Sequence, residues 1–321
     1  MKKSLVALAV LGAFAGAASA QSSVSIYGIV DAYVGSEDTG AAGGSVTKLD
    51  SGGLQASRLG FKGTEDLGGG LSAIFGLEAG LTVDNGTAGG FKFDRQSFVG
   101  FEGGFGQIIA GKVWSAYDDI SAASFSGFDS SFSPEYFAFG STAYTANPNN
   151  GFKYTSPDFG GFSGAISYAL DENNAVKENT SAFHLKYAAG PIYAGVAYQE
   201  ETAALVKSKY TRLGASYDLG MLKVLGSYGQ LKETGGAKTT DYSVGVDFPV
   251  SSALTLGAGY ARGKDNAVAG DEKRSAFGLV ATYALSKRTT AYAGYTTGEG
   301  KTNGVKTQEL DKYAVGVRHT F

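Results

Sequence analysis

Length, composition and charge already narrow the possible classes of protein. The chain has 321 residues, with 27 basic residues, 30 acidic residues and no cysteine. Disulfides, thiolate nucleophiles and thiolate-bound metal centres are therefore excluded, and the acidic balance argues against a nucleic-acid partner. The 49 glycines, 20 phenylalanines and 19 tyrosines, with only five prolines, favour many aromatic-bearing strands joined by flexible turns.

The first twenty residues have the three parts of a secretory signal peptide. Lys2 and Lys3 form a basic start, residues 5–17 are apolar, and residues 18–20 read Ala-Ser-Ala, a small-residue cleavage site. The apolar run is too short to span about 30 Å of hydrocarbon. We therefore predict a signal peptide over 1–20 and a single domain over 21–321.

The decisive signal in that domain is the alternation of apolar and polar residues with a period of two. Between residues 71 and 83, Leu71, Phe75 and Leu77 share one face, while Ser72 and Glu78 share the other. Such alternation is typical of a strand with one apolar and one polar face. The same pattern recurs in several later segments, at 183–187, 210–219 and 242–248.

Counting such segments predicts sixteen strands. They lie at about 23–35, 55–65, 70–83, 91–102, 105–113, 150–157, 161–171, 180–189, 192–200, 208–219, 221–232, 239–249, 253–262, 273–285, 288–297 and 311–321. Tight turns alternate with long polar connections, at 36–55, 84–90, 114–149, 171–179, 200–207, 233–238, 263–272 and 298–310. Short turns at one rim and long loops at the other are typical of an outer-membrane barrel. The predicted fold is all-β, a transmembrane antiparallel barrel of sixteen strands around an aqueous lumen. Aromatic residues near strand ends, among them Tyr27, Tyr33, Tyr260 and Tyr292, are expected to form girdles at the membrane interfaces.

Several ordered motifs resemble the general porins of Gram-negative bacteria, in particular the trimeric sixteen-stranded porins of β-proteobacteria. The resemblance covers nearly the whole domain and ends on the aromatic Phe321. It rests on the segments SSVSIYGIVDAYV (22–34), SRLGFKGTEDLGGGLSAIFGLE (57–78), FDRQSFVGFEGGFGQIIAGK (93–112), KYTSPDFGGFSGAISY (153–168), LSKRTTAYAGY (285–295) and YAVGVRHTF (313–321).

The resemblance implies a channel for passive diffusion of small hydrophilic solutes and ions. It further implies that the long third loop, 114–149, folds into the lumen and forms a constriction, where wall cations face loop carboxylates. Matched residue by residue, the basic side comprises Arg58, Arg95, Lys112 and Lys153, and the acidic side comprises Asp118, Asp119, Asp129 and Glu135. A further arginine of strongly anion-selective relatives has no counterpart in the stretch TANPNNGFK (145–153), so strong anion selectivity is not expected.

The resemblance also implies a location in the Gram-negative outer membrane and a homotrimer that contacts membrane lipid. Gly28, Ala32 and Gly35 could form a small-residue face that allows subunits to approach closely. No cofactor or metal is expected.

Three alternatives remain open at this stage. The third loop is rich in aromatic residues, which would suit a substrate-specific channel with a saturable solute site. An outer-membrane enzyme would need a nucleophile with a base, yet the two histidines, His184 and His319, are near no nucleophile motif. A barrel without conductance would be expected to have about eight strands and a filled interior. We therefore predict a channel and not an enzyme.

Overall fold

The computed structural model describes residues 23–86, 92–121, 123–172, 178–267 and 270–321. The predicted signal peptide lies outside these residues. Seventeen strand segments follow one another along the chain: β1 (Ser23–Asp38), β2 (Val46–Ser51), β3 (Arg58–Gly68), β4 (Leu71–Gly80), β5 (Gln96–Gly103), β6 (Gly106–Lys112), β7 (Gly151–Thr155), β8 (Phe162–Ala169), β9 (Glu178–Ala189), β10 (Ile192–Ala203), β11 (Val206–Asp218), β12 (Lys223–Glu233), β13 (Lys238–Pro249), β14 (Leu254–Ala267), β15 (Gly270–Ala284), β16 (Thr289–Thr302) and β17 (Val305–Thr320). Four short helices lie between β6 and β7: η1 (Asp118–Ile120), η2 (Gly127–Asp129), α2 (Glu135–Ala138) and η3 (Gly140–Thr142).

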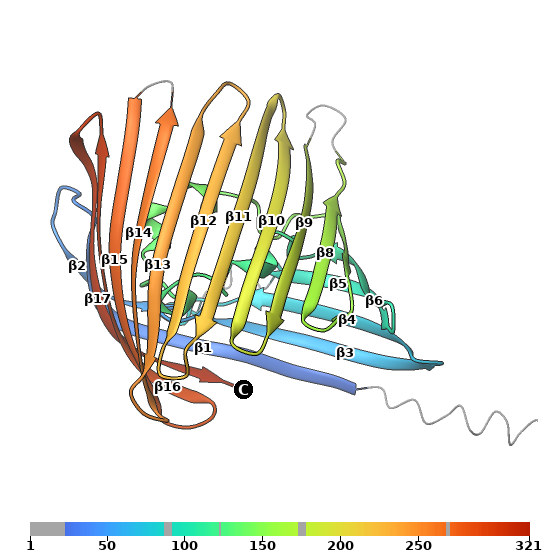
Figure 1. Ribbon diagram of the computed structural model, residues 1–321. Coiled ribbons are helices and arrows are strands. Elements are labelled where there is room, and N and C mark those ends of the chain that lie inside the picture. The colour runs from blue at the N-terminus through green and yellow to red at the C-terminus, as the bar shows by residue number, and fades with distance from the viewer. Residues whose placement is uncertain (1–22, 87–91, 122, 173–177, 268–269) are drawn as a thin grey trace, which may run out of the picture.

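The strands form one closed antiparallel barrel (Figure 1). From β3 onward each strand pairs with its neighbour in sequence, and β17 pairs with β1 to close the ring. β2 and β3 share one place in it, because β2 pairs with the later half of β1 and β3 with the earlier half. The seventeen segments therefore fill sixteen strand positions, which confirms the predicted strand number.

The break between β2 and β3 has a local cause. The carboxylate of Asp31 is fully buried and accepts hydrogen bonds from the backbone N–H groups of Gly53, Leu54 and Gln55 at 2.9–3.0 Å. Gly52 supplies the left-handed backbone conformation needed at this bend, with φ of +84°. Residues 52–57 are thus folded around one carboxylate instead of continuing the ladder.

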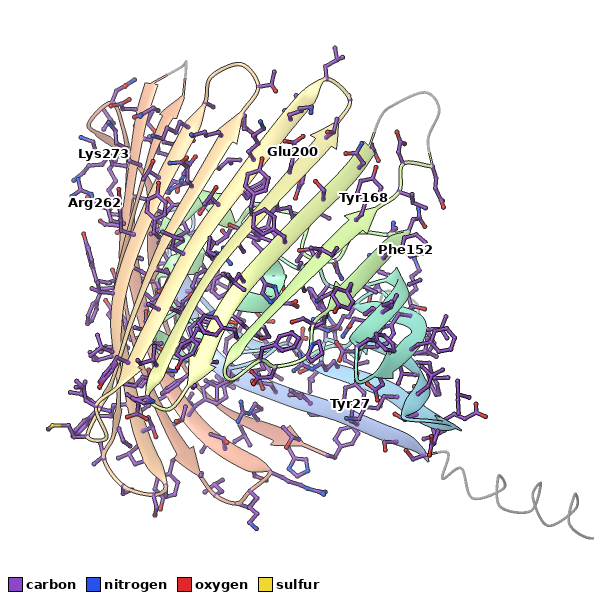
Figure 2. The ribbon with its side chains drawn as sticks, turned by 45° about the vertical axis from the view of Figure 1, so that its right-hand side comes forward. Tyr27, Phe152, Tyr168, Glu200, Arg262 and Lys273 are labelled. Carbon is purple, nitrogen blue, oxygen red and sulfur yellow. The ribbon has the colours of Figure 1, made fainter. Side chains whose placement is uncertain are left out.

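The distribution of apolar and polar side chains is the reverse of that in a soluble protein: the outer face of the barrel is apolar and the inner face is polar. In β13, Tyr242 and Val244 are 58% and 63% exposed on the outside, whereas Asp241 and Ser243 are buried on the inside. Side chains project from both faces of the wall in Figure 2. In β4, Leu71 lies outside and Glu78 inside, as the alternation predicted. An apolar exterior with a polar interior is the arrangement that lipid requires.

Three of the expected girdle residues face the other way. The hydroxyl of Tyr27 donates to the inward Glu78 at 2.9 Å. Tyr260 is exposed on the outer surface, but Tyr33 and Tyr292 are buried inside, where their rings contact the ring of Phe132. Parity along a strand decides the face: Tyr27 and Tyr33 share the parity of the inward Asp31 on β1, and Tyr292 shares that of the inward Thr296 on β16. The prediction of a girdle position was wrong for all three.

Several strands extend beyond their predicted ends. The expected loops 263–272 and 298–310 are mostly strand, since β14 continues to Ala267 and β16 to Thr302. Their polar, charged sequences predict loops, but a hairpin that projects into water needs no apolar face. At the other extreme, β5 begins at Gln96 and not near residue 91. No helix among the described residues is long and apolar enough to cross a membrane.

Candidate functional site

The connection between β6 and β7, residues 113–150, crosses to the far wall of the barrel. Its helix η1 contacts β9 and β10, η3 contacts β12 to β14, and η2 and α2 contact strands from β13 to β16. Figure 1 shows these short helices, in green, within the curve of the sheet. Strands that are distant in sequence are therefore linked through this one segment.

Glycines on the far wall allow the segment to lie directly on the strand backbone. A Cβ atom placed on Gly278 would lie 2.2 Å from the carbonyl oxygen of Phe132, and one on Gly294 would lie 2.4 Å from its ring. Real side chains do not fit at such distances. The Thr296 hydroxyl donates to that same carbonyl at 2.8 Å, and Ser131 N–H donates to the carbonyl of Gly53 at 3.0 Å. The tip of the segment is thus fixed both to β16 and to the adjacent bend at residues 52–57.

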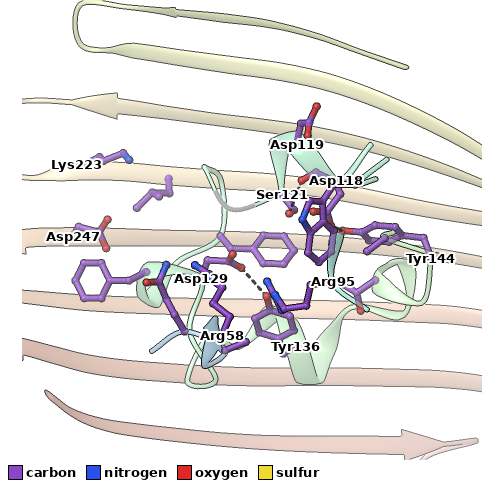
Figure 3. Close-up of a pocket in the computed structure, with 18 residues that line it drawn as sticks. Arg58, Arg95, Asp118, Asp119, Ser121, Asp129, Tyr136, Tyr144, Lys223 and Asp247 are labelled. Atoms are coloured by element: carbon purple, nitrogen blue, oxygen red, sulfur yellow. Dashed lines mark hydrogen bonds between the residues drawn. The ribbon is translucent and has the colours of Figure 1, made fainter. Parts of the chain in front are cut away.

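A cavity of about 700 Å³ lies between this segment and the wall. Arg58, at the start of β3, and Arg95, directly before β5, line it from one side. Asp118, Asp119 and Asp129 line it from the segment. Figure 3 shows Arg58 and Arg95 among the residues that line this cavity, together with Tyr136 and Asp129. The structure therefore brings together five of the eight residues expected at the constriction.

A carboxylate outside the cavity lining partly neutralises the positive charge of Arg58 and Arg95. Glu78 is almost fully buried, and its carboxylate lies 2.7 Å from Arg95 Nε and 3.8 Å from Arg58 Nε. Tyr27 donates a hydrogen bond to the same carboxylate at 2.9 Å. Arg95 also lies over the ring of Trp114, 5.2 Å from its centroid. Two guanidinium groups and one carboxylate together leave a single net positive charge here.

Two of the three carboxylates on the acidic side accept hydrogen bonds from neutral tyrosine hydroxyls. Tyr144 donates to Asp118 at 2.6 Å, and Tyr136 donates to Asp129 at 2.8 Å. Burial raises the pKa of Asp118, and it raises the pKa of Asp129 to about 6, although the hydrogen bond from Tyr136 opposes this shift. The loss of hydration disfavours the charged form in both groups.

Asp119 has a cationic partner instead. Lys153 lies 2.6 Å from Asp119 Oδ1, and Nδ1 of His184 lies 3.5 Å from Oδ2. The same Nδ1 donates to the carbonyl oxygen of Ala116 at 2.7 Å. Lys153 itself is buried and does not line the cavity. It reaches the site only through the carboxylate that it neutralises.

Two expected residues lie elsewhere. Glu135 is 0% exposed, and its carboxylate accepts hydrogen bonds from the backbone N–H and the hydroxyl of Ser126 at 3.1 Å. It closes a turn within the segment and does not reach the cavity, so the assignment to the acidic side was wrong for this residue. Lys112 donates to the carbonyl of Asn147 and to Oδ1 of Asn149, at 2.8 and 2.9 Å. It ties the end of the segment to β6 outside the cavity lining.

Three charged residues at or beside the cavity are not among the site residues predicted from the sequence. Lys223 and Asp247 stand opposite each other on β12 and β13 and line the cavity. Arg212, on β11, is completely buried, with its guanidinium 4.9–5.3 Å from the ring centroids of Tyr117, Phe125 and Tyr144. The alternation within 210–219 and 242–248 predicts that Arg212 and Asp247 face inward, and the same pattern extended to β12 predicts this for Lys223.

Comparison with known proteins agrees with this architecture. The family model described as Gram-negative porin matches residues 7–303. This chain belongs to the Gram-negative porin family. The outer membrane porin protein 32 of Delftia acidovorans is 35% identical over the full length of both chains, and a major outer membrane protein P.IB of Neisseria meningitidis is 33% identical over the same coverage. An anion-selective porin from Comamonas acidovorans has a similar structure, with a TM-score of 0.84 and 29% identity over 94% of this chain and 100% of its own.

The porin thus forms a passive channel in the outer membrane of a Gram-negative bacterium. Its family and its closed barrel, with apolar residues outside and charged residues inside, agree on this point. Among the described residues, no group of three or more histidine, aspartate or glutamate side chains is arranged to hold a metal ion.

Proposed function

We propose that this porin is a general-diffusion channel whose charge selectivity is set where Arg58 and Arg95 face Asp118, Asp119 and Asp129. The observation that carries the proposal is that these opposite charges line the two sides of one cavity inside the barrel. Low-dielectric walls focus the field between them. A solute that passes this point is therefore sorted by its charge and by the orientation of its dipole.

The balance of charge supports weak selectivity. Three cations line the cavity, Arg58, Arg95 and Lys223, against four carboxylates, which are the three of the loop and Asp247. Glu78 offsets one arginine from behind, and Lys153 offsets Asp119. The absence of a further arginine in 145–153 points in the same direction.

The test is the reversal potential of single channels in a planar bilayer under a salt gradient. Arg58→Ser with Arg95→Ser removes two positive charges and should shift permeability toward cations. Lys287→Ser with Arg288→Ser makes the same charge change in the exposed turn before β16 and should leave the reversal potential as it is. An unchanged reversal potential in the first variant, with normal yield of folded barrel, would overturn the proposed constriction.

A substrate-specific channel is the second candidate, and one observation favours it. Five aromatic residues line the cavity, namely Trp114, Phe125, Phe128, Tyr136 and Tyr144. Rings beside charges would suit a solute with both an apolar and a polar part. Saturable block of the single-channel current by one solute, at concentrations where others have no effect, would favour this candidate over general diffusion.

We also propose that the porin is a homotrimer. OmpT of Vibrio cholerae, a structural neighbour with a TM-score of 0.74 and 18% identity, is described in a trimer form. The small-residue face expected on β1 does not support the proposal, because Gly35 pairs with the inward Ala314 and the space beside Gly28 is filled by the ring of Phe321. Unboiled samples should migrate as an oligomer on detergent gels, and a monomer in native mass spectrometry with full conductance would refute it.

The proposed mature form begins at Gln21, after cleavage of residues 1–20. The basic start, the apolar run and the Ala-Ser-Ala site support this assignment. N-terminal sequencing of the protein isolated from outer membranes tests it directly, and a different first residue would contradict it.

A further inference from the structure

A buried cation lies between the wall and the segment 113–150. Arg212, on the inner face of β11, is 0% exposed. It pairs in register with Ala197 on β10 and with Gly229 on β12, two residues small enough to leave room for the segment that covers it. Within the part of the chain that the structure describes, its three side-chain nitrogens have no hydrogen-bond partner and it forms no ion pair. A buried charge without such partners is costly.

Aromatic rings surround the guanidinium of Arg212 instead. Its central carbon lies 4.9 Å from the ring centroids of Tyr117 and Phe125 and 5.3 Å from that of Tyr144. The faces of such rings attract a cation, and the attraction is stronger where water is excluded. An apolar side chain could pack against the same rings without the cost of a buried charge. Packing alone therefore does not explain why position 212 carries a charge.

One of these rings connects Arg212 directly to the acidic side of the cavity. The ring of Tyr144 contacts the guanidinium, and the Tyr144 hydroxyl donates to the carboxylate of Asp118 at 2.6 Å. Tyr144 and Asp118 both line the cavity, whereas Arg212 does not. A single side chain thus separates the buried cation from a carboxylate that faces the lumen.

A second path leads from Arg212 to Asp129. The ring of Phe125, which contacts the guanidinium, packs edge-on against the ring of Tyr136 with their centroids 5.9 Å apart. The Tyr136 hydroxyl donates to Asp129 at 2.8 Å (Figure 3). One buried cation therefore contacts the aromatic cluster that holds both of the hydrogen-bonded carboxylates on the acidic side.

The material between these charges transmits their interaction well. Arg212 and Tyr117 are 0% exposed and Phe125 is 2% exposed, so side chains and not water fill the space behind the segment. Charges that interact through such a layer are screened less than charges in water. In agreement, the charge of Arg212 opposes the rise in pKa that burial causes at Asp118 and at Asp129.

We propose that Arg212 is a positioning residue that determines the charge selectivity of the channel, because its buried positive charge acts through the aromatic rings on Asp118 and Asp129. The inference rests on the proposed constriction and adds a residue that does not face the lumen. Arg212 offsets part of the negative charge on the acidic side, as Glu78 offsets part of the positive charge on the basic side. Each side of the constriction then has a buried countercharge behind it, which keeps the channel weakly selective.

The first readout is the reversal potential of single channels under a salt gradient at pH 8, where Asp129 is ionised. Arg212→Met removes the charge and keeps an apolar side chain that packs well against rings. We expect permeability to shift toward cations by about two- to threefold. Arg212→Lys keeps a cation beside the rings and should stay within about 1.5-fold of the original protein. Arg288→Met, the matched control in the exposed turn before β16, should leave the reversal potential unchanged.

The second readout is the pH dependence of the reversal potential. Burial raises the pKa of Asp129 to about 6; the nearby carboxylates of Asp118 and Glu135 also raise it, whereas the hydrogen bond from Tyr136 and the charge of Arg212 lower it. Removal of that charge should therefore move the protonation step of Asp129 to higher pH in Arg212→Met. The step should stay near its original pH in Arg212→Lys. A residue that only supports the segment would not distinguish the two variants by charge.

Two results would overturn the inference: an unchanged reversal potential and pH step in a folded Arg212→Met barrel, or equal shifts in Arg212→Met and Arg212→Lys. If the methionine variant does not fold, Arg212→Gln removes the same charge and has the same expected results. The variant Arg58→Ser with Arg95→Ser separates this inference from the proposed constriction. If that variant shifts the reversal potential and Arg212→Met does not, only the role of Arg212 is refuted; if neither shifts it, the constriction is refuted too.

Discussion

Glu78→Gln is the sharpest test of how the basic side of the constriction works. The carboxylate of Glu78 lies 2.7 Å from Arg95 Nε and 3.8 Å from Arg58 Nε, and it cancels one of their two charges. The amide of glutamine keeps the shape and an oxygen acceptor but carries no charge. The net charge of this group should rise from +1 to +2, and permeability should shift toward anions.

The size of the shift follows from Coulomb's law. At a distance of about 8 Å, which is the Debye length near physiological salt, one unit charge contributes about 0.5 kcal/mol in water and about 2 kcal/mol at an effective dielectric constant of about 20. Each energy favours an anion and disfavours a cation, so the anion-to-cation permeability ratio changes by about sixfold in the first case and about a thousandfold in the second. Water fills the lumen of a barrel of this size and its mobile ions screen part of the energy at one Debye length, so we expect about two- to fivefold.

The cost in stability should be small enough for the barrel to fold. Loss of one partner from a buried ion pair costs about 3–5 kcal/mol, but both arginines also face the cavity and keep part of their hydration. We therefore expect a loss of about 1–2 kcal/mol, measured by urea unfolding in lipid vesicles. Glu102→Gln, which makes the same charge change beside the β5–β6 turn, is the control. A shift toward cations, or none at all in a folded Glu78→Gln barrel, would refute the reasoning.

Three further predictions concern other parts of the molecule. As the pH falls through about 6, Asp129 should take up a proton, so the cavity should lose a negative charge. The reversal potential should then shift toward anion selectivity, and Asp129→Asn should abolish this pH-dependent shift. Asp31→Asn should lower the free energy of unfolding by about 2–3 kcal/mol, because an amide N–H₂ would face backbone donors that now bind a carboxylate, and an unchanged urea midpoint would contradict this. Leu77→Lys places a cation on the lipid face at a cost of about 2–4 kcal/mol near the midplane, and folding yields in vesicles equal to those of Leu77→Ala would show that the face was assigned wrongly.

Strand number and face assignment were predictable because they depend on a local pattern. Lipid outside and water inside impose a strict alternation, so a segment such as 71–83 reveals both its conformation and its orientation without knowledge of its neighbours. Strand ends were less predictable, because the hairpin of β14 and β15 projects into water and has no apolar face to mark it. The break at 52–57 depends on Asp31, a residue more than twenty positions earlier, and no local pattern reveals it.

The site was predictable only in part, for a related reason. Arg58 and Arg95 lie in ordered motifs at the barrel wall, where fold and sequence are closely coupled. The positions of the loop carboxylates, in contrast, depend on how the segment 113–150 packs against the wall. Glu135 and Asp129 lie six residues apart in the same connection, yet one closes a buried turn on Ser126 and the other lines the cavity. Charge type alone could not distinguish these two environments.

The ion pairs and hydrogen bonds around the cavity indicate which charges control permeation. Glu78 and Lys153 are buried and each offsets an opposite charge at the cavity surface, so they tune the site without facing it. Asp118 and Asp129, in contrast, receive hydrogen bonds from tyrosine hydroxyls, which orient a carboxylate and leave its charge in place. The field across the cavity should therefore arise mainly between the partly neutralised arginines and these two aspartates. Selectivity then depends on a small difference between nearly balanced charges, which explains why a single buried substitution at position 78 should change its magnitude several-fold.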